Sequence, residues 1–174
     1  MEYFDVVDEN DEIIGKAERA EVHRKGLWHR GVHIVVINSE GKLLLQKRSM
    51  NKDLYKGFWI DGAAGHVESG ENYKHCAKRE LKEELGITAN LTRLFDFKKR
   101  TGLDNEFIHV FGCRHDGPFN VEKDEADFVR FFTLDEINKL LKKDREIFTP
   151  ATLNIIEEFN RRPELLKRLL RVDS

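Results

Sequence analysis

The most informative segment of the chain is residues 65–87, GHVESGENYKHCAKRELKEELGI. Asn72 is a typical helix N-cap residue, and Gly86 suits the left-handed position that follows a last helical turn. The segment therefore predicts a helix from about residue 72 to residue 85. With a rotation of about 100° per residue, its apolar side chains form one drifting stripe. The stripe comprises Tyr73, Ala77, Leu81 and Leu85, with Cys76 at its edge.

Three glutamates of this helix lie on or beside the apolar stripe. Glu80 and Glu84 fall inside it, and Glu83 lies at its border. Carboxylates at these spacings repel one another, and an unpaired buried charge costs several kcal/mol or more. Read alone, the composition is also typical of a solvated helix with an exposed Arg79–Glu83 ion pair. The position of the carboxylates on the apolar side, after a glycine-rich turn with its own Glu71, favours a bound cation instead.

The whole segment matches the pattern GX5EX7REUXEEXGU, in which U is a bulky aliphatic residue. This pattern is the Nudix box, so the chain resembles the Nudix hydrolase superfamily. The resemblance implies an α+β fold, an α/β/α sandwich with a mixed β-sheet and the Nudix loop-helix-loop. We expect one Nudix domain over residues 1–174, with the box at 65–87, an N-terminal hairpin at 3–17 and C-terminal helices at 133–171.

Carboxylates at this spacing suit the chemistry of diphosphates. The negative charge of a diphosphate repels an attacking water, and hard divalent cations such as Mg²⁺ neutralise that charge through oxygen ligands. By resemblance, Glu80 and Glu84 are the main metal ligands, Glu83 is a further ligand with a catalytic role, and the Gly65 carbonyl completes the set. Glu71 and Arg79 are implied to be structural partners within the box. The expected cofactor is Mg²⁺, with Mn²⁺ as an alternative.

Composition restricts the other classes of function. The chain has 174 residues, of which 36% are charged and 40% hydrophobic, which is typical of a globular protein with a substantial core. A formal net charge of −2 gives no basic surface for nucleic acid. The two cysteines, Cys76 and Cys113, are expected to be reduced core residues. Without a leader-like or membrane-spanning apolar run, a cytoplasmic enzyme that acts away from membranes is the expectation.

Patterns outside the box predict short strands and late helices. Alternation and turn residues indicate strands at 3–7, 13–17, 32–37, 42–47, 58–64, 91–99, 107–114 and 128–132, and a helical turn at 19–25. Thr133 and Glu136 form a capping box for a helix to about residue 143. Thr149 followed by Pro150 predicts a helix to about residue 161, and Pro163 opens a last one at 164–171. This order agrees with an α+β domain.

Further segments resemble the Nudix branch related to isopentenyl-diphosphate isomerase. They are DVVDE (5–9), VHRKGLWHR (22–30), LLQKR (44–48) and AAGH (63–66). In that isomerase a histidine cluster binds a metal, and a cysteine and a glutamate transfer protons. The resemblance makes His23, His29 and His66 candidates for the histidines, and Asp104-Asn105-Glu106 similar to the acidic segment. Ala64, however, stands where the cysteine would be, so one proton donor of the isomerase is missing.

The three histidines have alternative interpretations. They could form a second metal site, or an imidazole such as that of His66 could contact substrate phosphate. His33 and His109 alternate with apolar residues and are interpreted as sheet positions, whereas His75 and His115 are expected to face solvent.

Candidates for the remaining roles follow from position along the chain. Glu125 and Glu106 are rival general bases, each weighed against an exposed surface charge. Lys47 and Arg48, at the end of a strand, could bind phosphate. Trp59 could stack on a nucleobase or pack in the core.

Three functions are compatible with these residues. The first is a hydrolase of a nucleoside diphosphate, nucleoside triphosphate or related organic diphosphate. The second is an isomerase of the isopentenyl-diphosphate type, disfavoured by Ala64. The third is a non-catalytic nucleotide-binding module, disfavoured by the complete box. The substrate is a small molecule in the first two cases, and the hairpin or the last helix could support a homodimer.

Overall fold

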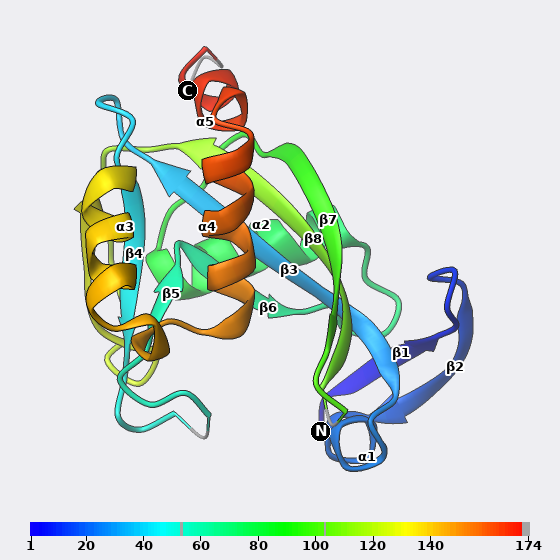
Figure 1. Ribbon diagram of the computed structural model, residues 1–174. Coiled ribbons are helices and arrows are strands. Elements are labelled where there is room, and N and C mark those ends of the chain that lie inside the picture. The colour runs from blue at the N-terminus through cyan, green and yellow to red at the C-terminus, as the bar shows by residue number, and fades with distance from the viewer. Residues whose placement is uncertain (53, 103, 172–174) are drawn as a thin grey trace.

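A computed structural model describes residues 1–52, 54–102 and 104–171 of the chain (Figure 1). The two N-terminal strands form a separate hairpin, β1 (Tyr3–Val7) and β2 (Ile13–Glu18), and α1 (Arg19–Lys25) follows it. The main sheet contains β3 (Trp28–Ile37), β4 (Leu43–Arg48), β5 (Trp59–Asp61), β6 (Ala63–His66), β7 (Thr92–Arg100), β8 (Asn105–Arg114) and β9 (Ala126–Phe132). The other helices are α2 (Tyr73–Leu85), α3 (Leu134–Lys143), α4 (Pro150–Arg161) and α5 (Glu164–Leu170), with a 3₁₀ turn at Arg145–Ile147.

The main sheet is mixed and lies between helices, as expected for an α/β/α sandwich. Its strand order is β5-β4-β3-β8-β7, with β6 paired to β3 and β9 paired to β4. The β3–β8 pair is parallel and the other pairs are antiparallel. One core cluster joins the sheet to α3, α4 and α5, and a second joins the opposite face to α2. Figure 1 shows α3 and α4 in front of the sheet and α2 behind it.

The long strand β3 brings together the residues of the candidate site. Its first half pairs with β6 on one side, with Gly31 opposite His66 and His33 opposite Ala64. On its other side it pairs with β8, where His29 lies opposite Glu106. Because β3 starts at Trp28 and not at residue 32 as predicted, His29 belongs to a strand.

The predicted single strand at 58–64 is wrong, because the structure divides it at Gly62. β5 pairs with β4, whereas β6 pairs with β3. A Cβ added to Gly62 would lie 2.1 Å from the Ile34 carbonyl oxygen, so only glycine lets the chain approach β3 at this change of partner. The continuous apolar pattern does not reveal the division.

The helix signals of the sequence are confirmed in detail. The Asn72 side chain accepts a hydrogen bond from the His75 amide, and Gly86 is left-handed with φ of 69°. Thr133 and Glu136 form the reciprocal capping box of α3, and Thr149 caps α4. Both cysteines are buried and free. In the described part of the chain, every helix is too short or too polar to cross a membrane.

Replacing Gly62 by alanine should destabilise the fold. The added Cβ would collide with the backbone of β3, and such overpacking costs about 1–3 kcal/mol. Gly15→Ala is the matched control, because its Cβ would have nothing within 4 Å. Urea unfolding of both variants measures the difference, and equal free energies of unfolding would contradict the role given to Gly62.

Candidate functional site

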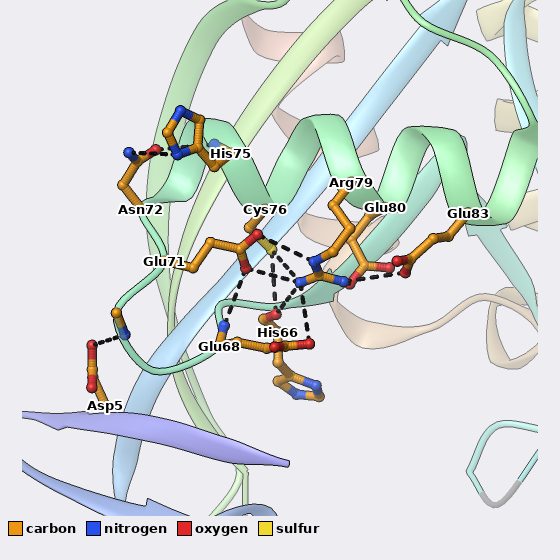
Figure 2. A network of polar contacts seen from close by, with 11 residues as sticks. Asp5, His66, Glu68, Glu71, Asn72, His75, Cys76, Arg79, Glu80 and Glu83 are labelled. Atoms are coloured by element: carbon orange, nitrogen blue, oxygen red, sulfur yellow. Dashed lines mark hydrogen bonds and ion pairs between the residues drawn. The ribbon is translucent and has the colours of Figure 1, made fainter.

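The guanidinium of Arg79 holds the box segment together (Figure 2). Its Nε and Nη2 donate to the two carboxylate oxygens of Glu71 at 3.2 and 2.9 Å. Its Nη1 donates to Glu80 at 2.6 Å and to Glu83 at 3.2 Å, and Nη2 also reaches the His66 carbonyl oxygen at 3.2 Å. One side chain of α2 therefore binds the loop before the helix, the end of β6 and two carboxylates of its own helix. These contacts agree with the structural role predicted for Arg79 and Glu71, which stays a prediction.

The N-terminal hairpin braces the same loop from the other side. Asp5 accepts hydrogen bonds from the Ser69 hydroxyl at 2.7 Å and from the Gly70 amide at 3.1 Å. The Ser69 amide donates to the Tyr3 carbonyl oxygen at 2.8 Å. The turn between β6 and α2 is thus fixed at both ends by backbone and side-chain bonds.

Glu80 and Glu84 lie against the β6 backbone. A Cβ on Gly65 would stand 2.1 Å from the Glu80 carboxylate, so the absent side chain leaves room for that group. Glu84 accepts a hydrogen bond from Gln46 at 2.7 Å and one from the Ala64 amide at 3.3 Å. Both glutamates, Glu83 and Gly65 line an open cleft of about 1180 Å³.

Glu80 and Glu84 are buried with too little positive charge around them to balance their ionised forms. Burial raises the pKa of Glu80 to about 7, against the opposing effect of Arg79. Burial, followed by repulsion from Glu80, raises the pKa of Glu84 to about 8. A cation between them would stabilise the charged forms and reverse these shifts. The arrangement therefore fits a divalent ion held by oxygen ligands.

The predicted bases and phosphate contacts are distributed around the cleft. Glu125 and Arg48 line it, and Lys52 bonds Glu125 at 2.6 Å. The charge of Glu125 also adds, after burial and Glu80, to the raised pKa of Glu84. Arg48 donates to the Leu54 carbonyl oxygen at 3.2–3.3 Å, which places its guanidinium in the 49–58 loop.

Lys47 and Trp59 are placed differently from Arg48. The Lys47 ammonium lies 5.1 Å from the centre of the Trp59 ring, and that ring packs against Phe132 in the core. Along β4, Lys47 shares a face with Leu45, whereas Gln46, which bonds Glu84, faces the other way. Neither residue is among the described residues that line the cleft. This placement argues against the predicted substrate contacts of Lys47 and Trp59.

Histidines and acids form a second cluster at the end of the cleft. The ring atoms of His23, His29 and His66 come within metal-ligand spacing of one another, and His29 and His66 do so with Asp104 and Glu106. His66 Nε2 lies 2.8 Å from Glu106. Lys99 lies 2.5 Å from both acids. Although burial raises the pKa of Glu106, the nearby His29, His66 and Lys99 hold that pKa well below its usual range.

Two atoms of this cluster lack a partner among the described residues, His29 Nε2 and Asp104 Oδ1. His29 Nδ1 lies 3.0 Å from the Leu27 carbonyl oxygen, which can only accept, so Nδ1 carries the ring proton. In the neutral ring, Nε2 then directs a lone pair toward Asp104 at 3.7 Å and Glu106 at 3.6 Å. These distances exceed a hydrogen bond, and three acceptors facing one another fit a cation.

Sequence reasoning named the box, the three histidines and both acids as candidates, but it missed several residues that line the cleft or support it. Gln46, which anchors Glu84, and Lys52, which pairs with Glu125, had no motif around them. Lys99 was read only as part of a strand, although its position opposite Glu106 in the β7–β8 register brings it to the cluster. His33 was interpreted as a sheet position and also lines the cleft.

Comparisons with known proteins place this geometry in context. A sequence model described as NUDIX domain matches residues 27–152. An isopentenyl-diphosphate Delta-isomerase of Pectobacterium atrosepticum is 36% identical, over 83% of this chain and 83% of that protein. An uncharacterized Nudix hydrolase of Clostridium acetobutylicum is 33% identical, over 99% of this chain and 89% of that protein.

Solved structures show the same fold. The crystal structure of DR0079 from Deinococcus radiodurans superposes with a TM-score of 0.72 at 25% identity, covering 82% of this chain and 90% of that one. A MutT protein from Methanosarcina mazei gives a TM-score of 0.66 at 23% identity, covering 79% and 96%.

Replacing Arg79 by lysine should loosen the box segment. An ammonium cannot reproduce the paired bonds to Glu71 together with those to Glu80 and the His66 carbonyl. We expect the free energy of unfolding to fall by about 1–2 kcal/mol, allowing for partial exposure. Arg145→Lys, at an exposed ion pair with Glu157, should cost less than about 0.5 kcal/mol. Equal urea midpoints for the two variants would contradict this role.

Proposed function

Because the chain belongs to the Nudix family, we propose that it is a divalent-metal-dependent hydrolase of a diphosphate linkage. The substrate class is a nucleoside diphosphate, a nucleoside triphosphate or a related organic diphosphate. The observation that carries the proposal is the intact box at the cleft: Glu80 rests on Gly65, and Glu84 is anchored by Gln46 and the Ala64 amide. These are the residues that would hold Mg²⁺ or Mn²⁺.

The chain's own groups account for the other requirements of the reaction. A divalent ion at Glu80 and Glu84 would neutralise phosphate charge and acidify a bound water. Arg48 and Lys52 bring cations to the same cleft, where they can bind phosphate oxygens. Glu125 is the better placed base, because its charge reaches Glu84 and raises the pKa of that residue. Glu125 pairs with Lys52, whereas Glu106 is held by both His66 and Lys99.

Ala64 separates this proposal from isomerase activity, although several relatives are named isomerases. A methyl group cannot donate or accept the proton that the isomerase's cysteine transfers. The intact carboxylate set likewise favours turnover over a binding module.

We also propose that the histidine–acid cluster binds a second metal ion. His29 Nε2 and Asp104 Oδ1, which have no partner in the described chain, would become ligands together with His66 and Glu106. Mixed imidazole and carboxylate ligands suit Mn²⁺ or Zn²⁺ better than Mg²⁺. The box, which has only oxygen ligands, suits Mg²⁺ or Mn²⁺, so Mn²⁺ is the ion expected to bind at both sites.

Glu84→Gln should abolish hydrolysis. The neutral amide removes a metal ligand, and loss of several kcal/mol of transition-state stabilisation lowers the rate about 100-fold or more. Product release is measured with Mg²⁺ on nucleoside diphosphates, nucleoside triphosphates, dinucleotides, sugar conjugates and isopentenyl diphosphate. Glu164→Gln, an exposed position on α5, is the matched control and should keep full activity. Isomerisation of isopentenyl diphosphate without cleavage of any compound would overturn the proposal.

His29→Asn tests the second metal site separately. The asparagine amide can keep the bond to the Leu27 carbonyl while Nε2 is removed. Titration calorimetry with Mn²⁺ should show one fewer tight site than in the wild type, with the box site retained. His75→Asn, at an exposed position of α2, should leave the stoichiometry unchanged. The same stoichiometry in both variants would refute a site at His29.

A further inference from the structure

A buried polar chain runs from the cleft into the core beneath it. His33 Nδ1 lies 2.9 and 3.1 Å from the two carboxylate oxygens of Asp61. Asp61 also accepts a hydrogen bond from the Thr152 hydroxyl at 2.7 Å, and Thr149 donates to Thr152 at 2.9 Å. All four residues are buried, and none has a role in the metal sites described above.

These hydrogen bonds determine which nitrogen of the His33 ring carries the proton. An ionised carboxylate only accepts, so the proton is assigned to Nδ1, and Nε2 of the neutral ring is left as an acceptor. His33 is 8% exposed and lines the cleft. Because Nδ1 points inward to Asp61, the ring meets the cleft through its distal edge, which carries Nε2. No described residue bonds that atom.

The neighbours of His33 define what can approach it. It is the cross-strand partner of Ala64, so the imidazole and the small methyl group share one face of the sheet. Gly31, two residues earlier on the same face, would place a Cβ 3.3 Å from Glu106. The ring therefore has the small residues Ala64 and Gly31 beside it on the sheet, with the Asp61 carboxylate behind it.

The other groups of the cleft indicate which part of a substrate lies at His33. We expect the diphosphate at Glu80 and Glu84 with their ion and at the cations Arg48 and Lys52, which leaves the space beside His33 for the organic group. An uncharged group with an O–H or N–H would complete the bonding of Nε2.

We propose that His33 is a specificity residue that accepts a hydrogen bond from a donor on the organic group of the substrate. Asp61 is its positioning residue, and Thr152 holds Asp61. The inference rests on the proposed function and narrows it to organic diphosphates whose non-phosphate group carries a hydroxyl, amino or amide N–H. Alkyl diphosphates, which lack such a donor, are disfavoured, because they would cover the Nε2 acceptor without bonding it.

The first test is His33→Asn with two probes, adenosine diphosphate and isopentenyl diphosphate. An asparagine amide can keep the bond to Asp61, but it lacks an atom at the position of Nε2. Calorimetry in Ca²⁺, which takes the same oxygen ligands as Mg²⁺, measures binding independently of turnover. The wild type should bind adenosine diphosphate more tightly than isopentenyl diphosphate. In the variant, the affinity for adenosine diphosphate should fall about 10-fold, and the affinity for isopentenyl diphosphate should change less than about twofold.

A second variant, Asp61→Asn, distinguishes the effect of the position of the ring proton from the effect of removing the ring. An amide there can donate to Nδ1, which moves the proton to Nε2 and turns the acceptor into a donor. Affinity for adenosine diphosphate should fall as in His33→Asn, although the imidazole is retained. Nitrogen-15 NMR should show His33 protonated on Nδ1 in the wild type and on Nε2 in the variant. Thermal unfolding verifies that both variants fold.

The outcomes separate this inference from the hydrolase proposal. The role of His33 would be overturned if His33→Asn changed the affinity for both probes equally or for neither. It would also be overturned if the wild type showed no preference for adenosine diphosphate. Failure to release product from any compound, with the binding preference intact, would overturn the hydrolase proposal and leave the role of His33 standing.

Discussion

The interaction on which the rest of the site depends is the multiple pairing of Arg79. Carboxylates crowded on one side of a helix repel one another, and a single guanidinium with five donors relieves part of that repulsion. It also bonds the His66 carbonyl oxygen, which fixes β6 relative to α2. Glu71, Glu80 and Glu83 are thereby held in place before any ion binds. Glu84 lies outside this network and relies on Gln46 and a backbone amide.

The incomplete balance of charge is as informative as the pairing. Arg79 is shared among four carboxylates, those of Glu71, Glu80, Glu83 and, at 4.0 Å, Glu68. The pKa values of Glu80 and Glu84 nevertheless remain raised, first by burial. Apolar residues at these positions would give a more stable protein, because buried charges without full compensation cost free energy. Their retention at an open cleft agrees with a site that an external cation completes. The facing acceptor atoms of His29 and Asp104 likewise lack a hydrogen-bond partner among the described residues.

The sequence was a good guide where a signal is local and a poor one where it depends on pairing. The caps of α2, α3 and α4 and the apolar stripe of the box helix are contained in short segments, so they could be predicted. The division at Gly62 could not, because both halves read as one apolar run and only the choice of partner strand separates them. Lys47 and Arg48 show a related limit, since adjacent residues on a strand face opposite sides. His33 and Asp61 are 28 positions apart in the sequence and lie on different strands, so a single sequence does not indicate that they form a pair.

One face of β3 and β6 bears on the choice between the proposed hydrolysis and an isomerase reaction. Ala64 offers no thiol for a proton transfer, and His33 lies opposite it across the strand pair. The structure places there an imidazole that is bonded to a buried carboxylate, beside a complete Nudix box. With a cation at the box carboxylates, this arrangement would suit binding of the organic group at one end of the cleft and hydrolysis of the diphosphate at the other.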